Sequence, residues 1–150
     1  MESCDRYAGL KLENQLCFPL YVCAKEVVRR YKPILDELDI TYTQYITMMA
    51  LWEHRSLSLK DIGAMICLDS GTLTPLLKKL EEKGYVERSR DRDDERVLTV
   101  SVTEKGMDLR ERALSVPGSV ATCIPISPEE ALVLARILRG MMAEFSAQQQ

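Results

Sequence analysis

The amino-acid sequence predicts a mainly α-helical fold with a small β-wing, organised as a winged helix-turn-helix. Helix patterns over 58–66 and 70–83 are separated by three residues, which is the layout of a helix-turn-helix. Gly84 then ends the second helix, and two short strand patterns around a charged tip predict a hairpin. Long helices with apolar faces at both ends of the chain complete the expected fold.

The composition is that of a globular protein. The 150 residues are 46% hydrophobic and 29% charged, which suits one domain with added helices. The net charge of −3 argues weakly against a nucleic-acid partner, which usually meets a basic surface. Basic residues nevertheless recur between Lys78 and Arg96, so we expect a local basic stripe on an acidic body.

Two features predict a cytoplasmic protein with no membrane role. No apolar run approaches the roughly 18–20 residues that span a bilayer. The polar N-terminus lacks the apolar core of a secretory signal peptide. In a reducing compartment the cysteines are expected to be thiols most of the time. They are Cys4, Cys17, Cys23, Cys67 and Cys123.

Two helices are expected before the helix-turn-helix. The first covers 14–38, where Pro19 fits only near the start and Pro33 predicts a bend or a break. The run from Thr41 to Gln44 has the pattern of a capping box and opens a second helix over 43–54.

The elements after residue 66 follow from caps and breakers. Asp69 or Ser70 caps the second helix of the pair, and the strands are expected at 85–90 and 97–101. Thr103 then caps a fifth helix that runs to about residue 115, with the break or kink at Pro117-Gly118. Ser127 and Pro128 give a strong start signal for the last helix.

The terminal helices are expected to pair two copies of the chain. Their apolar faces exceed what a small helix-and-wing core can cover, so 1–40 and 116–150 are predicted to be dimerisation helices around a DNA-binding lobe at 41–115. A two-fold homodimer presents two reading helices about one DNA turn, roughly 34–36 Å, apart. The expected partner is therefore a double-stranded DNA operator with inverted half-sites.

The N-terminal part of the helix over 70–83 is the candidate for reading bases. Hydroxyls can bond phosphates or base edges, a threonine methyl can touch a thymine methyl, and glycine lets the backbone approach. Two lysines further along are expected near phosphates. An ordinary capped surface helix would also carry such residues, and the hairpin behind it favours DNA. The candidates are Ser70, Gly71, Thr72, Thr74, Lys78 and Lys79.

The hairpin carries arginines that suit a DNA groove. Its tip at 91–96 can reach the minor groove, where the negative potential favours arginine. A solvated mixed-charge tip is the ordinary alternative. Asp94 is expected to orient Arg96 in a fork-shaped pair, since a carboxylate that faced phosphates would repel them. The candidates are Arg88, Arg90, Arg92, Asp94 and Arg96.

The segment LTPLLKKLEEKGYVERSRDRDDERVLTVSVTEKG resembles the MarR family of winged-helix repressors, including the D-x-R at 94–96 and the T-E-x-G at 103–106. The segments ENQLCFPLY, YKPILDELDITYTQY, LWEH and LDSGTLTPLLKKLE resemble its organic-hydroperoxide-sensing branch, the OhrR proteins. The resemblance implies that Cys17 senses the peroxide and that Tyr31 and Tyr42 of the partner subunit hydrogen-bond it. It also implies that Arg96 enters the minor groove. Cys123 resembles, by position, the resolving cysteine of two-cysteine members.

The residues around Cys17 support a reactive thiol independently. Cys17 falls in the first turn of the first helix, where unpaired amide hydrogens and the positive helix end stabilise a thiolate. Apolar neighbours such as Phe18 would favour organic peroxides over hydrogen peroxide. The ordinary alternative is a small buried hydrophobic residue. If no second protein thiol takes part, Cys17 would end as a mixed disulfide with a small thiol.

The expected function is a repressor that leaves its operator when an organic hydroperoxide oxidises Cys17, through a disulfide to Cys123 of the partner. The alternative is a repressor released by a phenolic or aromatic ligand in a pocket lined by Tyr21, Tyr31, Tyr42 and Trp52. A thiol peroxidase and a protein-interaction module are weaker alternatives. With His54 as the single histidine and no phosphate-binding loop, no metal, cofactor or enzymatic activity is expected.

Overall fold

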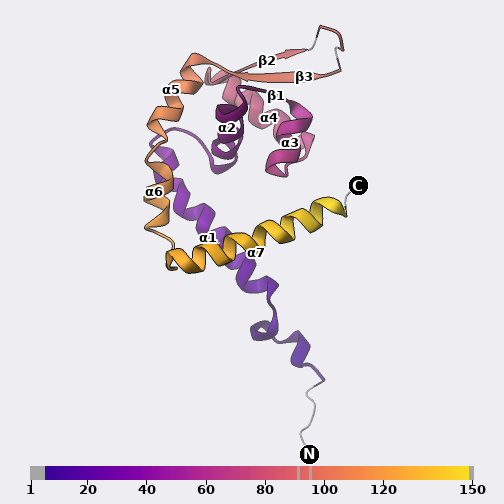
Figure 1. The fold of residues 1–150 in the computed structure, drawn as a ribbon, viewed down its shortest axis with the longest axis vertical. Helices are drawn as coiled ribbons and strands as arrows, with labels where there is room; N and C mark the ends of the chain where they lie inside the picture. The colour runs from indigo at the N-terminus through magenta and orange to yellow at the C-terminus, as the bar shows by residue number, and fades with distance from the viewer. Residues whose placement is uncertain (1–5, 91, 95, 149–150) are drawn as a thin grey trace, which may run out of the picture. The chain divides into compact units, whose positions relative to one another are not determined.

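The computed structural model describes residues 6–90, 92–94 and 96–148, so Cys4 and the tip residues Asp91 and Glu95 lie outside it. The described chain forms two compact units with a boundary after Val120 (Figure 1). In chain order the elements are η1 (Ala8–Leu10), η2 (Leu12–Asn14), α1 (Cys17–Asp36), α2 (Tyr42–His54), β1 (Ser56–Ser58), α3 (Leu59–Ile66), α4 (Ser70–Glu82), β2 (Val86–Arg90), β3 (Leu98–Val102), α5 (Glu104–Arg112), α6 (Val116–Ala121) and α7 (Pro128–Ala147).

The predicted winged helix-turn-helix is confirmed, with α3 and α4 as its helix pair. The Ser58 hydroxyl caps α3 by accepting from the Asp61 amide at 3.1 Å. Cys67 ends α3 in the left-handed conformation, with φ of 55°. A Cβ on Gly63 would lie 2.7 Å from the Leu68 carbonyl oxygen, so the tight turn between the helices needs glycine at that position.

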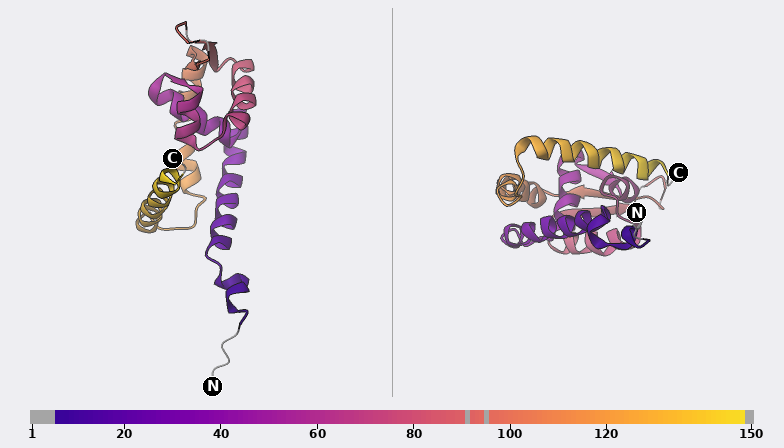
Figure 2. Two further views of the ribbon diagram at one scale, coloured as in Figure 1. Left: turned by 90° about the vertical axis from the view of Figure 1, so that its right-hand side faces the viewer. Right: turned by 90° about the horizontal axis from the view of Figure 1, so that it is seen from below.

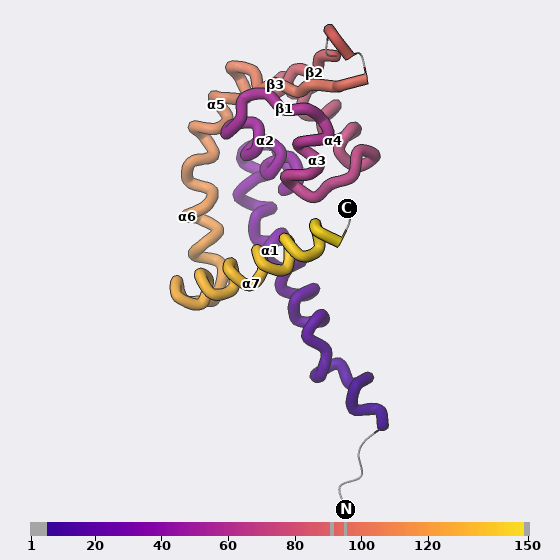
Figure 3. The backbone as a smooth tube through the Cα atoms, turned by 45° about the vertical axis from the view of Figure 1, so that its right-hand side comes forward, coloured from indigo at the N-terminus to yellow at the C-terminus, as the bar shows by residue number. Residues whose placement is uncertain are grey.

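The wing is an antiparallel sheet of three strands in the order β1-β3-β2 (Figure 3). The β2–β3 hairpin pairs Val86 with Val102 and Arg90 with Leu98. The third strand, β1, pairs Ser56 with Ser101 and was not predicted. Its three residues are too few for a period-two pattern, and β1 runs directly into α3.

The core of the lobe lies between α2, α3, α4, α5 and the sheet. The Trp52 indole nitrogen donates to the Gly106 carbonyl at 2.8 Å, which ties α2 to α5. A Cβ on Gly106 would overlap the Tyr85 carbonyl oxygen, which explains the glycine of the T-E-x-G motif. Fully buried side chains of this core include Met48, Leu51, Ile62, Leu73, Leu77, Leu80, Val86, Val100 and Leu109.

Helix α1 extends away from the lobe, as Figure 2 shows. It is continuous through Pro33, so of the predicted bend or break at that residue the break is wrong. It begins at Cys17 instead of residue 14, because η1 and η2 occupy the preceding segment. Of the α1 residues only Leu35, near the C-terminal end, is buried in the single chain. A proline inside a helix removes one hydrogen bond, and the rest of the turn holds the helix together here.

The segment after the wing differs from its prediction in one respect. Thr103 caps α5 as expected, by accepting from the Gly106 amide at 3.0 Å. The interruption falls at 113–115, and Pro117-Gly118 lies inside α6 instead of ending a helix. Proline at the second residue of α6 is tolerated because first-turn amides have no intrahelical acceptor.

In the C-terminal unit, α7 begins as predicted with Ser127 as cap and Pro128 as first residue. Ser127 and Glu130 form a complete capping box, with the Ser127 amide 2.7 Å from the Glu130 carboxylate. No residue of α7 is buried, and its apolar side chains, such as Leu134 and Ile137, are exposed. No helix of the described residues has the length and apolar character to cross a membrane.

Candidate DNA interface and thiol site

Two hydroxyls at the exposed N-terminus of α4, those of Thr72 and Thr74, already donate hydrogen bonds within the protein. The Asp69 carboxylate accepts from the Thr72 amide at 2.9 Å and from the Thr72 hydroxyl at 2.8 Å. These bonds hold the pKa of Asp69 below its ordinary value. The Thr74 hydroxyl donates to the Ser70 carbonyl at 2.7 Å. Thr72 and Thr74 therefore offer a methyl group and an acceptor oxygen, but no free donor, to a base edge.

Ser70 and Gly71, at the same end of α4, are accessible from outside the protein. Among the described residues the Ser70 hydroxyl has no hydrogen-bond partner. A Cβ on Gly71 would meet only the Asp69 carboxylate, at 3.1 Å, so the backbone there can be approached from outside. The first two turns of α4 carry no cation, and its first lysine is Lys78. Bidentate recognition of guanine by arginine or lysine is therefore unavailable at this end of α4.

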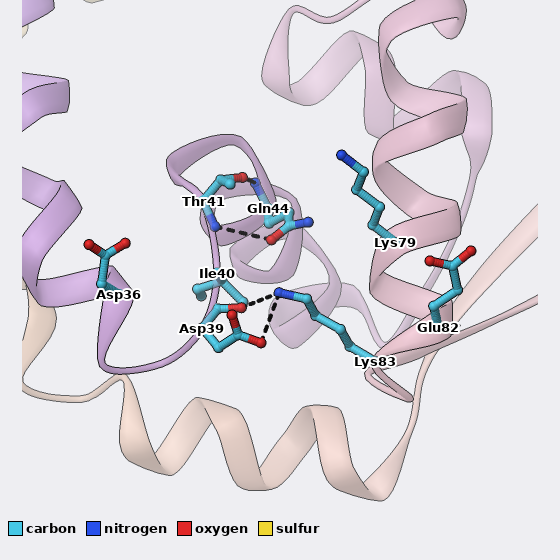
Figure 4. A pocket seen from close by; sticks show the side chains of 8 residues that line it. All are labelled: Asp36, Asp39, Ile40, Thr41, Gln44, Lys79, Glu82 and Lys83. Atoms are coloured by element: carbon cyan, nitrogen blue, oxygen red, sulfur yellow. Dashed lines mark hydrogen bonds and ion pairs between the residues drawn. The ribbon is translucent and has the colours of Figure 1, made fainter.

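The two lysines predicted near phosphates lie towards the C-terminal half of α4, and both are exposed. Lys79 faces an open cavity of about 390 Å³ beside the turn between α1 and α2 (Figure 4). Within the described part of the chain its ammonium has no hydrogen-bond or ion-pair partner. Other residues that line the cavity are Asp36, Asp39, Ile40, Thr41, Gln44, Glu82 and Lys83.

At the base of the wing, Arg88 is held by Glu81 of α4. Its Nη2 and Nε atoms lie 2.7 and 2.9 Å from one Glu81 oxygen, and its backbone amide donates to the other oxygen at 3.1 Å. These hydrogen bonds keep the pKa of Glu81 below its ordinary value. We call this pair the wing brace. Glu81 was not predicted, because only the fold shows that α4 and β2 lie side by side here.

At the tip of the wing, Asp94 orients Arg96 in the expected fork. The Arg96 Nε and Nη2 atoms lie 3.0 and 3.4 Å from the two Asp94 oxygens. The Arg96 side chain is 91% exposed, and its hydrogen bonds lower the pKa of Asp94. Arg92 has no partner among the described residues, while Arg90 makes contacts of its own. The wing thus ends in a pre-oriented, accessible guanidinium.

Cys17 is the first residue of α1 and is exposed. The preceding residue, Leu16, provides no side-chain cap, so the first-turn amides have no side-chain acceptor from it. The exposed apolar side chains of Phe18 and Leu20 lie on the same turn of the helix. Cys123 belongs to the C-terminal unit, is half-buried, and lies 3.9 Å from the Thr122 hydroxyl. Both cysteines are free thiols.

The two predicted tyrosines lie together where α1 meets α2. The ring centroids of Tyr31 and Tyr42 are 4.8 Å apart, and Tyr45 lies 5.9 Å from Tyr31. Burial raises the pKa of Tyr31, and Tyr42 adds to the shift, so the phenol stays protonated and able to donate a hydrogen bond. Tyr45 was not predicted, although its spacing from Tyr42 places both on one side of α2. Tyr21 is separate and lies under the Lys25 ammonium.

Comparisons with known proteins give the family. The family described as transcriptional regulator SarA/Rot matches residues 29–112. The chain is 47% identical over 116 residues to the organic hydroperoxide resistance transcriptional regulator of Bacillus subtilis, covering 77% of this chain and 79% of the relative. The chain therefore belongs to the SarA/Rot family of transcriptional regulators. The predicted resemblance to MarR-type regulators of the hydroperoxide-sensing branch is thereby confirmed.

Solved structures agree with this assignment. The regulator is similar to reduced AbfR bound to DNA, with a TM-score of 0.78, 31% identity, and coverage of 94% of this chain and 96% of that one. It is also similar to a structure of disulfide-formed AbfR, with a TM-score of 0.61, 31% identity and 94% coverage of both chains. The protein is therefore a DNA-binding transcriptional regulator with a winged-helix fold.

Proposed function

We propose that the protein is a homodimeric repressor that organic hydroperoxides release from its operator by oxidising Cys17. The observation that carries this proposal is the position of Cys17, an exposed thiol at the uncapped start of a long helix. Helix N-termini stabilise thiolates, and the thiolate is the form that attacks a peroxide. The relative from Bacillus subtilis, named for organic hydroperoxide resistance, supports the same signal.

DNA binding in this proposal uses two separate surfaces of the lobe. The N-terminal turns of α4, with Ser70, Gly71, Thr72 and Thr74, enter the major groove. The wing tip, with Arg92 and Arg96, enters the adjacent minor groove. Lys78 contributes to the positive potential along the phosphates, and the wing brace fixes the angle between the two surfaces. Exposed methyls and pre-bonded hydroxyls on α4 favour half-sites with thymine at the contacted steps.

The dimer in this proposal is formed by the helices at the two ends of the chain, segments 1–40 and 116–150. Each carries apolar side chains that a single chain leaves exposed, among them Val22 on α1 and Leu134 and Ile137 on α7. Burying such faces against a second copy is the usual solution for amphipathic helices. A two-fold pair then presents both lobes, 41–115, to inverted half-sites of double-stranded DNA.

The chemistry proceeds in two balanced steps. The Cys17 thiolate attacks the terminal peroxide oxygen, the O–O bond breaks, and the alkoxide leaves as the alcohol after taking a proton. The Cys17 sulfenic acid is then attacked by the thiol of Cys123 of the partner subunit, which forms a disulfide and releases water. Tyr31 and Tyr42 of the partner subunit donate hydrogen bonds to the Cys17 sulfur before oxidation. The disulfide needs Cα atoms within about 7 Å, so it forces the helices into one fixed arrangement.

The test is operator binding before and after cumene hydroperoxide, for the wild type, Cys17→Ser and Cys123→Ser. Cys23→Ser is the matched control, because Cys23 is another exposed thiol of α1. We expect the wild type and the control to release DNA and to form a disulfide-linked dimer on a non-reducing gel. A Cys17→Ser variant that is still released by peroxide contradicts the proposal. Release of reduced protein by a salicylate-like compound alone would favour a ligand-operated repressor instead.

A further inference from the structure

Helix α1 is anchored to the lobe at its C-terminal end. Its 20 residues span about 30 Å, and only Leu35 among them is buried. The turn that follows is also fixed in the core, because Leu38 and Ile40 are buried. A force on the exposed N-terminal part of α1 therefore reaches the lobe through residues 35–40, together with the ring contacts of Tyr31 with Tyr42 and Tyr45.

The turn at the end of α1 has an unusual residue at its centre. The Asp39 amide donates to the Asp36 carbonyl at 3.1 Å, and the Ile40 amide donates to the Leu35 carbonyl at 3.2 Å. This is the Schellman arrangement, in which the residue in the left-handed conformation is usually glycine. Here it is Asp39, with φ of 54°. A residue that adopts a disfavoured conformation in place of glycine points to a role for its side chain.

The role is visible in the contacts of Asp39 with α4. The Lys83 ammonium donates to the Asp39 carbonyl and lies 3.2 Å from its carboxylate, as the dashed lines in Figure 4 mark. Lys83 is the C-terminal cap residue of α4. The Lys83 side chain is only 29% exposed, although that of Asp39 is 87% exposed, so the lysine is laid against the protein surface to reach the turn.

A second cation reaches the same turn from the other side of the lobe. Arg112, the last residue of α5, donates to the Glu37 carbonyl at 3.2 Å. The carbonyl of Lys83 itself accepts from the Lys105 ammonium at 2.7 Å. The C-terminal end of α4 is thus fixed to the α1 turn through Asp39 and to α5 through Lys105.

We propose that Asp39 and Lys83 are positioning residues that fix the angle between α1 and the reading helix α4. We call the pair the joint. It makes the position of α1 in one subunit determine the direction of α4, and hence the spacing of the two reading helices in a dimer. The DNA part of this proposal needs only a dimer. The response to oxidation rests on the function proposed above.

The test compares Lys83→Met with Lys79→Met. The two lysines lie one turn apart on α4 and line the same cavity, but Lys79 lacks a partner among the described residues. Each protein is titrated with an operator selected in vitro and with the same duplex after one half-site is scrambled. We expect Lys83→Met to lower the full-site to half-site affinity ratio about tenfold. Lys79→Met removes the same charge but no contact with the α1 turn, so it should lower the ratio less than Lys83→Met does.

Substitutions at Asp39 distinguish a positioning role of its side chain from a purely local role in the turn. Asp39→Gly relieves the backbone conformation but removes the carboxylate, so a mere turn residue would keep the ratio or gain stability. We expect Asp39→Gly to lower the ratio, but less than Lys83→Met does, because Lys83 can still donate to the backbone carbonyl of residue 39. The double variant should add nothing to the effect of Lys83→Met. Thermal unfolding of each variant is measured alongside.

An unchanged ratio in Lys83→Met overturns the joint, whether or not the variant loses thermal stability. If the wild-type protein still binds its operator after peroxide treatment, the proposed thiol function is contradicted. The affinity ratio still tests the joint in that case. If the joint and the thiol function are both correct, peroxide should change the full-site affinity of Lys83→Met less than that of the wild type.

Discussion

At the scale of single residues, Gly106 and Gly140 differ in whether the structure leaves room for a side chain. Gly106 lies where the end of the hairpin meets α5, with the Tyr85 carbonyl oxygen in the space of a Cβ. Gly140 lies on the exposed surface of α7, and a Cβ there would meet nothing within 4 Å. One glycine is required by packing, and the other only lowers the helix propensity of its segment.

Substitution with alanine should therefore change stability in opposite directions. We expect Gly106→Ala to lower the free energy of unfolding by about 1–3 kcal/mol, because the backbone must move to admit the methyl group. Gly140→Ala should raise it by about 0.5–1 kcal/mol through helix propensity. Urea unfolding of both variants measures the difference. Equal effects at the two sites would mean that Gly106 does not pack as described.

Thr72 illustrates how a hydrogen bond within the protein restricts what a residue can read. Its hydroxyl proton is given to Asp69, so its methyl group is the part available to a base. Replacing thymine by deoxyuridine in the half-site should weaken the wild type two- to fivefold, or about 0.5–1 kcal/mol, at one contacted step. Thr72→Ser should bind both duplexes equally, and Thr72→Val should keep the preference. A Thr72→Ser protein that still prefers thymine would contradict this assignment.

At the scale of elements, most of the lobe could be predicted because each helix has a local start signal. Thr41, Ser58, Asp69 and Thr103 cap the helices of the lobe, and Ser127 caps α7 outside it. Hydroxyl or carboxyl caps are visible in a sequence. The strand β1 was missed because its three residues gain their structure from pairing with β3, more than forty positions away. The alternative of a break at Pro33 was wrong because a helix can lose one hydrogen bond and continue.

The same contrast holds for the candidate site. The Asp94–Arg96 pair could be predicted from two residues that are neighbours in the chain. The wing brace could not, because Glu81 and Arg88 face each other only after α4 and β2 pack together. Asp39 and Lys83 are still further apart, and no periodicity links a turn to the end of a distant helix. Contacts that depend on tertiary packing carry no local signal.

The wing brace has a definite pH dependence. Hydrogen bonds from Arg88 lower the pKa of Glu81 in the folded protein, so the stability it contributes is present above the ordinary carboxyl value of about 4.3. That stability is lost as pH falls through the lower value of the folded state. Glu81→Gln should therefore destabilise the protein more at pH 7 than at pH 3, as urea unfolding at the two values would measure. An equal loss of unfolding free energy at pH 7 and pH 3 would mean that the Glu81–Arg88 ion pair does not stabilise the protein.

At the scale of the whole molecule, the described chain consists of a DNA-binding lobe and of terminal helices whose apolar side chains are largely exposed. The lobe has its own buried core, from Met48 to Leu109. Helix α7 has none, and its exposed Leu134 and Ile137 lie one turn apart. A helix with an uncovered apolar face is stable in water when a second surface covers it. Loss of that surface should leave the lobe folded and the operator affinity reduced.

The variant Leu134→Glu/Ile137→Glu tests this division. It places two charges on the apolar face of α7, where burial without a partner charge is costly, so we expect monomers in sedimentation at micromolar protein. Because both half-sites can no longer be bound at once, full-operator affinity should fall by about 10²-fold or more, towards that of one half-site. Arg136→Glu is the matched control on the same turn and should remain dimeric. A dimeric double variant with full operator affinity would show that α7 does not form the dimer, which would leave the exposed face of α1 as the dimer surface.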